Sequence, residues 1–103
     1  MQKLRTVIVD DEPLSLDLLR ALLSEFSDIE IIGECSNGKE AVEAAVRLQP
    51  ELLFLDIQMP GMNGFDVIKS LQTDIMPMVV FITIGIISVC RDLITSKPFI
   101  PGI

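Results

Sequence analysis

Short apolar runs alternate along this chain with longer segments in which apolar residues recur every three or four positions. The runs are rich in β-branched residues and stop abruptly at acidic or turn-forming residues, which is typical of buried strands. Four strands are therefore predicted, at residues 4–9, 29–35, 52–55 and 78–83. The segments with helical periodicity predict three helices, at residues 13–26, 39–48 and 65–71.

The order of these elements, with strands and helices in strict alternation, predicts the fold class. Since parallel strands are joined by crossovers through helices, such a chain forms an α/β domain with helices on both faces of one parallel sheet. We expect a doubly wound sheet with the strand order 2-1-3-4 and an incomplete fifth position. A chain of 103 residues has room for one such domain.

Local signals predict where the helices begin and end. Pro13 suits a first helical turn, and the acidic residue before it, Glu12, can cap the free amides there. The pair Ser27-Asp28 is expected to end this first helix. Asn37-Gly38 predicts the turn into the second helix.

Charge and length exclude several classes of partner. Fifteen acidic and eight basic residues give a net charge of −7, which is the wrong sign for direct nucleic-acid binding. The longest uncharged stretch, residues 75–90, has sixteen residues and contains Pro77, so it is too short to cross a membrane. The N-terminus lacks the apolar segment of a signal peptide. We therefore expect a cytoplasmic protein.

The residue types that are missing narrow the chemistry. The chain has no histidine, and its two cysteines are Cys35 and Cys90. Histidine-ligated zinc sites, histidine general bases and disulfide frameworks are therefore excluded. Both cysteines are expected to be buried thiols. The methionines Met59, Met62, Met76 and Met78 are expected to serve packing rather than metal binding.

Two of the predicted strands end in carboxylates, the first at Asp10 and Asp11 and the third at Asp56. Strands one and three are neighbours in the expected sheet, and their carboxyl ends share one edge, where ligands of open α/β sheets bind. Three clustered carboxylates repel one another unless a cation joins them. Mg²⁺ fits best, because it takes carboxylate ligands and leaves positions for phosphoryl oxygens. The sequence therefore predicts a magnesium site suited to phosphoryl transfer.

Three motifs at the ends of predicted strands together resemble a known family. They are Val9-Asp10-Asp11-Glu12-Pro13, the run from Leu53 to Gly64 (LFLDIQMPGMNG), and Phe81-Ile82-Thr83. They are similar to the receiver domain of two-component response regulators, which has a flavodoxin-like (CheY-like) fold. The residues of the first two motifs are similar to those in the branch of this family whose full-length members carry a LytTR-type DNA-binding output domain. The resemblance covers residues 1–83.

The resemblance implies a role for each matching residue. Asp56 takes the phosphoacceptor position, which receives a phosphoryl group from a sensor histidine kinase. Asp11, Asp56 and the backbone carbonyl of Gln58 match the Mg²⁺ ligands, and Asp10 holds the ion directly or through water. Thr83 matches the switch hydroxyl, and Lys97, before Pro98, matches a catalytic lysine. Pro60 and Gly64 match the turn after the phosphoacceptor, with Gly64 free to take a positive φ. The resemblance also implies a homodimer of receiver domains, and no turnover beyond self-phosphorylation and autodephosphorylation.

The chain departs from the family pattern after Thr83. Ile84 replaces a small residue, no tyrosine is present, Lys97 follows Thr83 by fourteen positions, and five residues follow Pro98. Residues 1–83 are therefore expected to form a receiver core, and residues 84–103 a divergent, truncated tail of the same domain. A frameshift or premature stop, a degenerate receiver selected for another role and an unusual fifth strand all account for this tail.

Three other functions compete with the phosphoacceptor. A receiver fragment that no longer accepts phosphate and acts only as an interaction module, or has no function, is the main alternative. A phosphatase of the haloacid dehalogenase type needs two aspartates separated by one residue, whereas Asp10 and Asp11 are adjacent. A flavodoxin-like nucleotide binder needs a loop rich in Ser, Thr and Gly after the first strand, where this chain has acidic residues.

Overall fold

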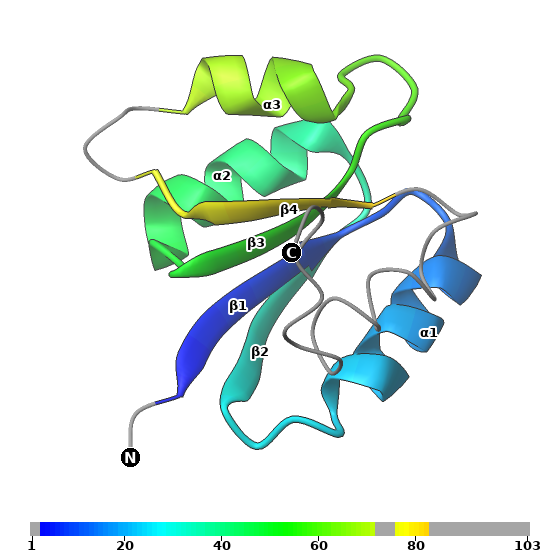
Figure 1. Ribbon diagram of the computed structural model, residues 1–103. Coiled ribbons are helices and arrows are strands. Elements are labelled where there is room, and N and C mark those ends of the chain that lie inside the picture. Colours follow the sequence, from blue (N-terminus) through cyan, green and yellow to red (C-terminus); the bar gives the residue numbers. More distant parts are fainter. Residues whose placement is uncertain (1–2, 72–75, 83–103) are drawn as a thin grey trace, which may run out of the picture.

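A computed structural model describes residues 3–71 and 76–82 (Figure 1). Strands and helices alternate along these residues, as the hydrophobic pattern predicts. The elements are β1 (Leu4–Val9), α1 (Pro13–Leu23), β2 (Ile29–Cys35), α2 (Gly38–Leu48), β3 (Leu52–Asp56), α3 (Gly64–Ser70) and β4 (Met78–Ile82).

The strands form one parallel sheet in the order β2-β1-β3-β4. This confirms the predicted α/β class and the doubly wound order. β1 pairs with both β2 and β3, and its last residue, Val9, lies opposite Cys35 on one side and Leu55 on the other. The carboxyl ends of β1 and β3 are therefore neighbours at one edge of the sheet.

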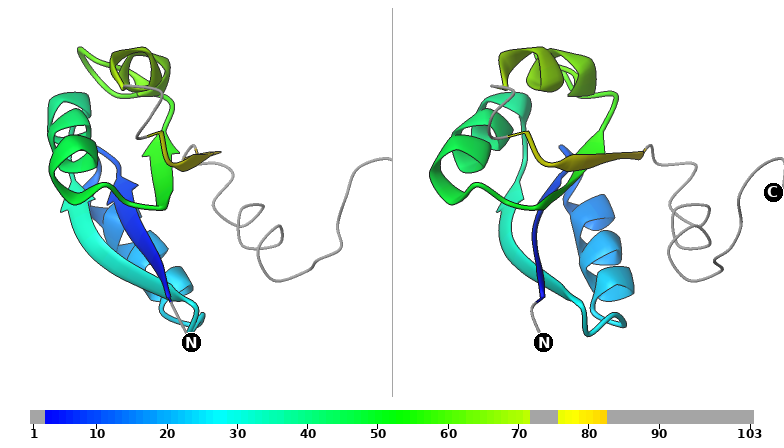
Figure 2. Two further views of the ribbon diagram at one scale, coloured as in Figure 1. Left: turned by 90° about the vertical axis from the view of Figure 1, so that its left-hand side faces the viewer. Right: turned by 60° about the vertical axis from the view of Figure 1, so that its left-hand side comes forward.

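Helices cover both faces of the sheet, with α1 on one side and α2 and α3 on the other (Figures 1 and 2). The alternation of side chains along the strands separates two cores. On the face of α1, Ile8 and Phe54 pack with Leu19 and Leu23. On the opposite face, the core is made of strand, helix and loop residues, namely Val7, Val9, Cys35, Ala41, Ala44, Ala45, Leu53, Leu55, Met59, Val67 and Leu71.

The ends of α1 correct two local predictions. The helix ends at Leu23 rather than at Phe26, because the chain tightens into turns in which the amides of Glu25 and Phe26 bond to carbonyls three residues earlier. Pro13 does occupy the first turn, but the side chain of Glu12 makes no capping hydrogen bond. The backbone carbonyl of Glu12 instead accepts the amide of Leu16 at 3.1 Å.

The other two helices each begin one residue earlier than predicted. In both cases an asparagine caps the first turn, with Asn37 accepting the amide of Glu40 and Asn63 accepting the amide of Asp66. The glycine after each asparagine is therefore the first helical residue. Because glycine after asparagine is typical of turns, the sequence pattern predicts that each helix begins one residue later.

Several predictions concern residues outside the described part of the chain. They are the switch role of Thr83, the catalytic role of Lys97, the burial of Cys90 and the nature of the segment 84–103. Cys35 is a buried free thiol, as predicted. In residues 3–71 and 76–82, no helix is long and apolar enough to span a membrane.

Candidate functional site

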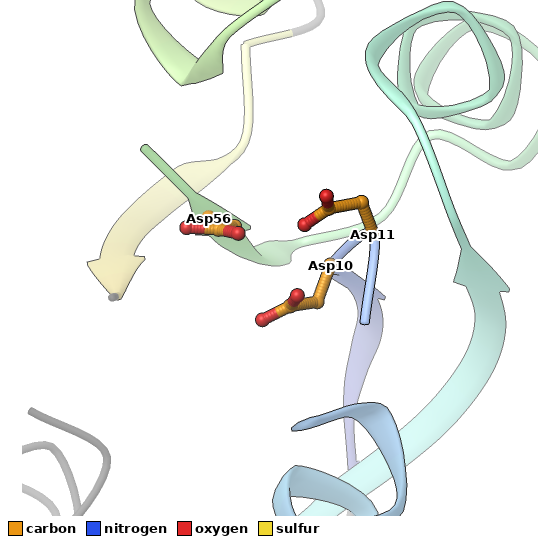
Figure 3. Close-up of side chains that lie close together, drawn as sticks. All are labelled: Asp10, Asp11 and Asp56. Atoms are coloured by element: carbon orange, nitrogen blue, oxygen red, sulfur yellow. The ribbon is translucent and has the colours of Figure 1, made fainter. Parts of the chain in front are cut away.

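Three carboxylates meet at the edge of the sheet where β1 and β3 end (Figure 3). Asp10 and Asp11 follow β1 directly, and Asp56 is the last residue of β3. Each offers one carboxylate oxygen, and these three oxygens lie within 4.8 Å of one another. The cluster predicted from the strand ends is therefore present.

Backbone pairing holds the three residues in place. The amide of Asp10 donates to the carbonyl of Cys35 at the end of β2, at 3.1 Å. The amide of Ile57, directly after Asp56, donates to the carbonyl of Ile82 in β4, also at 3.1 Å. All four strands thus fix the backbone from which the carboxylates project.

Two of the carboxylates are almost completely buried, with 1% of Asp10 and 3% of Asp56 exposed. Each accepts one backbone amide two residues further on. Glu12 donates to Asp10 Oδ1 at 2.9 Å, and Gln58 donates to Asp56 Oδ1 at 3.1 Å. Asp11 is partly exposed, so the cluster has one side open to solvent.

Burial and mutual repulsion disfavour the charged forms. Desolvation raises the pKa of Asp56 to about 6, with the charges of Asp10 and Asp11 adding to the effect and the amide of Gln58 opposing it. Desolvation also raises the pKa of Asp10, and the charge of Asp11 contributes. The folded chain therefore concentrates negative charge where it costs free energy.

A divalent cation fits this donor set. Within residues 3–71 and 76–82, the salt bridges that Lys or Arg forms involve Arg20 with Asp17 and Glu34, so none reaches the cluster. Carboxylate oxygens are hard ligands, and a small cation such as Mg²⁺ is typically held by one or two of them while it keeps several waters. Asp10, Asp11 and Asp56 are the residues that could hold it.

The loop after Asp56 turns back on the end of β3. The amide of Gly64 donates to the carbonyl of Ile57 at 3.0 Å. A Cβ on Gly64 would lie 2.8 Å from the carbonyl oxygen of Asp56 and 3.1 Å from the Cα of Ile57. Gly64 is therefore required by a close approach of two backbone segments.

This geometry corrects one expectation drawn from the family resemblance. Among the described glycines, the positive φ belongs to Gly61, at 81°, and not to Gly64. Gly61 takes the left-handed conformation in the tight turn where the amide of Met62 donates to the carbonyl of Pro60. Met59 is buried and Met62 partly buried, as the packing interpretation predicts, but Met76 and Met78 are exposed, so that interpretation is wrong for these two.

Sequence reasoning missed the contact between this loop and α2. A Cβ on Gly38 would lie 2.7 Å from both Cβ and Cγ of Met62. In the sequence, Gly38 is the second residue of the turn pair Asn37-Gly38. No local pattern links it to Met62, 24 positions later.

Comparison with known proteins gives a consistent result. The response regulator receiver domain family matches residues 6–89. The transcriptional regulatory protein BtsR of Escherichia coli K12 is 49% identical over 80 residues, which are 78% of this chain and 34% of that protein. An uncharacterized response regulatory protein of Yersinia pestis is 50% identical over 80 residues, with the same shares of each chain. The chain spans about a third of the length of these relatives.

Solved structures agree with the fold. The receiver domain of the putative response regulator NarL from Mycobacterium tuberculosis is 31% identical, with a TM-score of 0.74 over 81% of this chain and 68% of that one. The response regulator domain of CheB from Thermotoga maritima is 27% identical, with a TM-score of 0.72 over 89% of this chain and 72% of that one.

Proposed function

Because this chain belongs to the response regulator receiver domain family, we propose that it accepts a phosphoryl group on Asp56 in a two-component signalling system. The observation that carries the proposal is the cluster of Asp10, Asp11 and Asp56, whose oxygens lie within 4.8 Å of one another at the end of β1 and β3. A sensor histidine kinase is the proposed donor.

Residues of this chain would hold a Mg²⁺ ion beside the acceptor. Asp11, Asp56 and the backbone carbonyl of Gln58 are the proposed ligands, with Asp10 bound directly or through water. When bound, Mg²⁺ supplies positive charge that offsets the carboxylates and the incoming phosphoryl oxygens. The raised pKa values of Asp10 and Asp56 support this proposal, because burial, and to a lesser extent the neighbouring carboxylates, disfavours their charged forms, which a bound cation would stabilise.

The transfer itself is a substitution at phosphorus. A carboxylate oxygen of Asp56 attacks the phosphorus of a phosphohistidine, the new O–P bond forms an acyl phosphate, and the P–N bond breaks to release the imidazole. With its pKa at about 6, Asp56 is mostly ionised at neutral pH and has the electron pair that the attack needs. The backbone amide of Gln58, bonded to Asp56 Oδ1, orients the carboxylate so that its other oxygen can react.

Two residues beyond the described part complete the proposal. Thr83 directly follows Ile82, whose carbonyl accepts a hydrogen bond from the amide of Ile57, the residue after Asp56. The hydroxyl of Thr83 is therefore proposed to sense the phosphoryl group. Lys97 is proposed as a catalytic cation. One relative is named a transcriptional regulatory protein, and we propose that a receiver of this kind controls such an output when the two are joined.

Mass spectrometry of the intact protein tests the proposal. The purified chain is incubated with acetyl phosphate, with and without Mg²⁺, alongside Asp56→Asn and the matched control Asp28→Asn, a substitution at an exposed position away from the cluster. The proposal predicts a gain of one phosphoryl group that requires Mg²⁺, persists in the control and is absent from Asp56→Asn. A folded wild-type chain that gains no phosphoryl group would overturn it.

A measurement of sensor-kinase binding beside this experiment separates the alternative function. If the unphosphorylated chain and Asp56→Asn bind a sensor kinase equally well and neither is labelled, the chain is an interaction module rather than a phosphoacceptor.

A further inference from the structure

The first turn of α2 lies against the loop that follows Asp56. A Cβ on Gly38 would meet the Cβ and Cγ of Met62 at 2.7 Å and the backbone oxygen of Met62 at 2.8 Å. Side-chain Cβ atoms essentially never come this close to other atoms, and two of the three atoms contacted cannot rotate away. A methyl group at position 38 must therefore displace the backbone of the loop or the first turn of α2.

The loop has little freedom to absorb such a displacement. At its far end, Gly64 is packed on the backbone of Asp56 and Ile57 and bonded to Ile57. In its middle, the turn bond from the amide of Met62 to the carbonyl of Pro60 makes residues 60–62 compact. The buried side chain of Met59 anchors the part next to Gln58. The loop between Gln58 and Met62 therefore offers few ways to absorb a displacement of Met62 locally.

We infer that Gly38 is a positioning residue for the acidic site, acting through Met62 on the loop that carries Gln58. This rests on the proposed function, because it gives the loop its role in Mg²⁺ binding. The requirement for glycine is spatial, since Gly38 is not among the described residues with positive φ. In a helix, alanine is otherwise favoured over glycine.

Titration calorimetry with Mg²⁺ tests the inference on the full chain. Gly38→Ala is compared with Gly33→Ala, where a Cβ would meet only side-chain atoms, Leu48 Cδ1 at 3.2 Å and Val7 Cγ2 at 3.5 Å. Gly38→Ala is expected to weaken Mg²⁺ binding about tenfold, which is typical for residues that support metal ligands, whereas Gly33→Ala leaves it unchanged. Equal Mg²⁺ affinities for wild type and Gly38→Ala would overturn the inference.

A double-mutant cycle shows whether the effect runs through Met62. Met62→Gly removes two of the three atoms that the new methyl group meets. The double variant Gly38→Ala/Met62→Gly should therefore bind Mg²⁺ more tightly than the product of the two single effects predicts. If the two effects multiply without coupling, the contact with Met62 is not the route and the inference fails.

Amide chemical shifts without metal distinguish failure of the inference from failure of the proposed function. Gly38→Ala should move the amide signals of Gln58, Met59 and Met62 in metal-free protein, and Gly33→Ala should not. If the loop signals move in Gly38→Ala but the wild type binds no Mg²⁺, the loop contact stands and the metal role of the site is overturned. Mg²⁺ binding by the wild type with unmoved loop signals in Gly38→Ala would overturn the inference alone.

Discussion

Asp10 directly follows β1 and Asp56 ends the neighbouring strand β3, and their nearly buried carboxylates approach within 4.8 Å of each other. Each carboxylate accepts a single backbone amide, so most of its hydrogen-bonding capacity remains available. Such an arrangement stores electrostatic repulsion in the metal-free fold. Stability and metal binding should therefore respond to changes in these carboxylates and in the loop that surrounds them.

Removing the charge of Asp56 should stabilise the metal-free protein at neutral pH. The pKa of Asp56 is raised to about 6 in the folded chain from 3.8, so folded protein binds this proton more tightly than unfolded protein. The free energy of unfolding therefore falls as pH rises from about 4 to about 6, and the penalty is complete above that range. Asp56→Asn should raise the free energy of unfolding by roughly 1–3 kcal/mol at about pH 7.5 in a chelator.

Urea denaturation of both proteins across this pH range measures the difference, with Asp28→Asn as the control. The gain should shrink as pH falls through this range and approach zero below about pH 3, where Asp56 is protonated in both states. A gain that does not change with pH would show that Asp56 carries no repulsive charge.

Mg²⁺ should stabilise the wild-type chain, and this effect should weaken as pH falls below about 6. Protons compete with the metal for Asp56 and Asp10, because both carboxylates have raised pKa values. At a concentration one hundred times its Kd, the ion adds about 2.7 kcal/mol to the free energy of unfolding. Thermal unfolding with Mg²⁺ or a chelator, from about pH 5 to about pH 8, measures this. Stabilisation that is equal at both ends of the range would contradict the assignment.

Gly64→Ala should disturb the site far more than Gly61→Ala. At position 64 the new Cβ would lie 2.8 Å from the carbonyl of Asp56, so the end of β3 or the loop must move, at a cost of about 1–3 kcal/mol. At position 61 the Cβ would enter open space, and only the positive φ of 81° is strained, at about 1–2 kcal/mol. Both variants should be destabilised in urea, but Gly64→Ala alone should lose most of its Mg²⁺ affinity. Equal Mg²⁺ affinities of the two variants would count against the close approach.

Asn63→Ala should lower the free energy of unfolding by about 1 kcal/mol through loss of a helix cap. Asn63 Oδ1 accepts the amide of Asp66 at 2.9 Å, and Asp66 Oδ2 accepts the amide of Asn63 at 3.1 Å. Urea denaturation measures the loss. Asn37→Ala, which removes the corresponding cap of α2, serves as the comparison and should cost a similar amount. No loss of stability in Asn63→Ala would mean that this reciprocal cap is not formed in solution.

The sequence predicts the structure best where a short local pattern decides it. The first and third strands end where apolar runs meet carboxylates, and together with the expected strand order this places Asp10, Asp11 and Asp56 at one edge of the sheet. Helix ends are predicted less well. At α1 the apolar Phe26 continues the helical period, yet the helix ends at Leu23.

Contacts between distant segments are out of reach of such rules. The interpretation of Gly64 as a residue with positive φ follows a general property of glycine, whereas the actual constraint is the backbone of Asp56 lying against it. The same applies to Gly38 and Met62, which meet only after the sheet has brought α2 and the loop together.

Locating the phosphoryl group tests the central claim most directly. The chain is incubated with acetyl phosphate and Mg²⁺, treated with borohydride to reduce any acyl phosphate to an alcohol, digested, and analysed by tandem mass spectrometry. We predict that position 56 is converted from aspartate to homoserine, with Asp10 and Asp11 unchanged and no conversion in the sample without Mg²⁺. Conversion at another carboxylate, or none in a folded wild-type chain, would contradict the assignment of Asp56 as the phosphoacceptor.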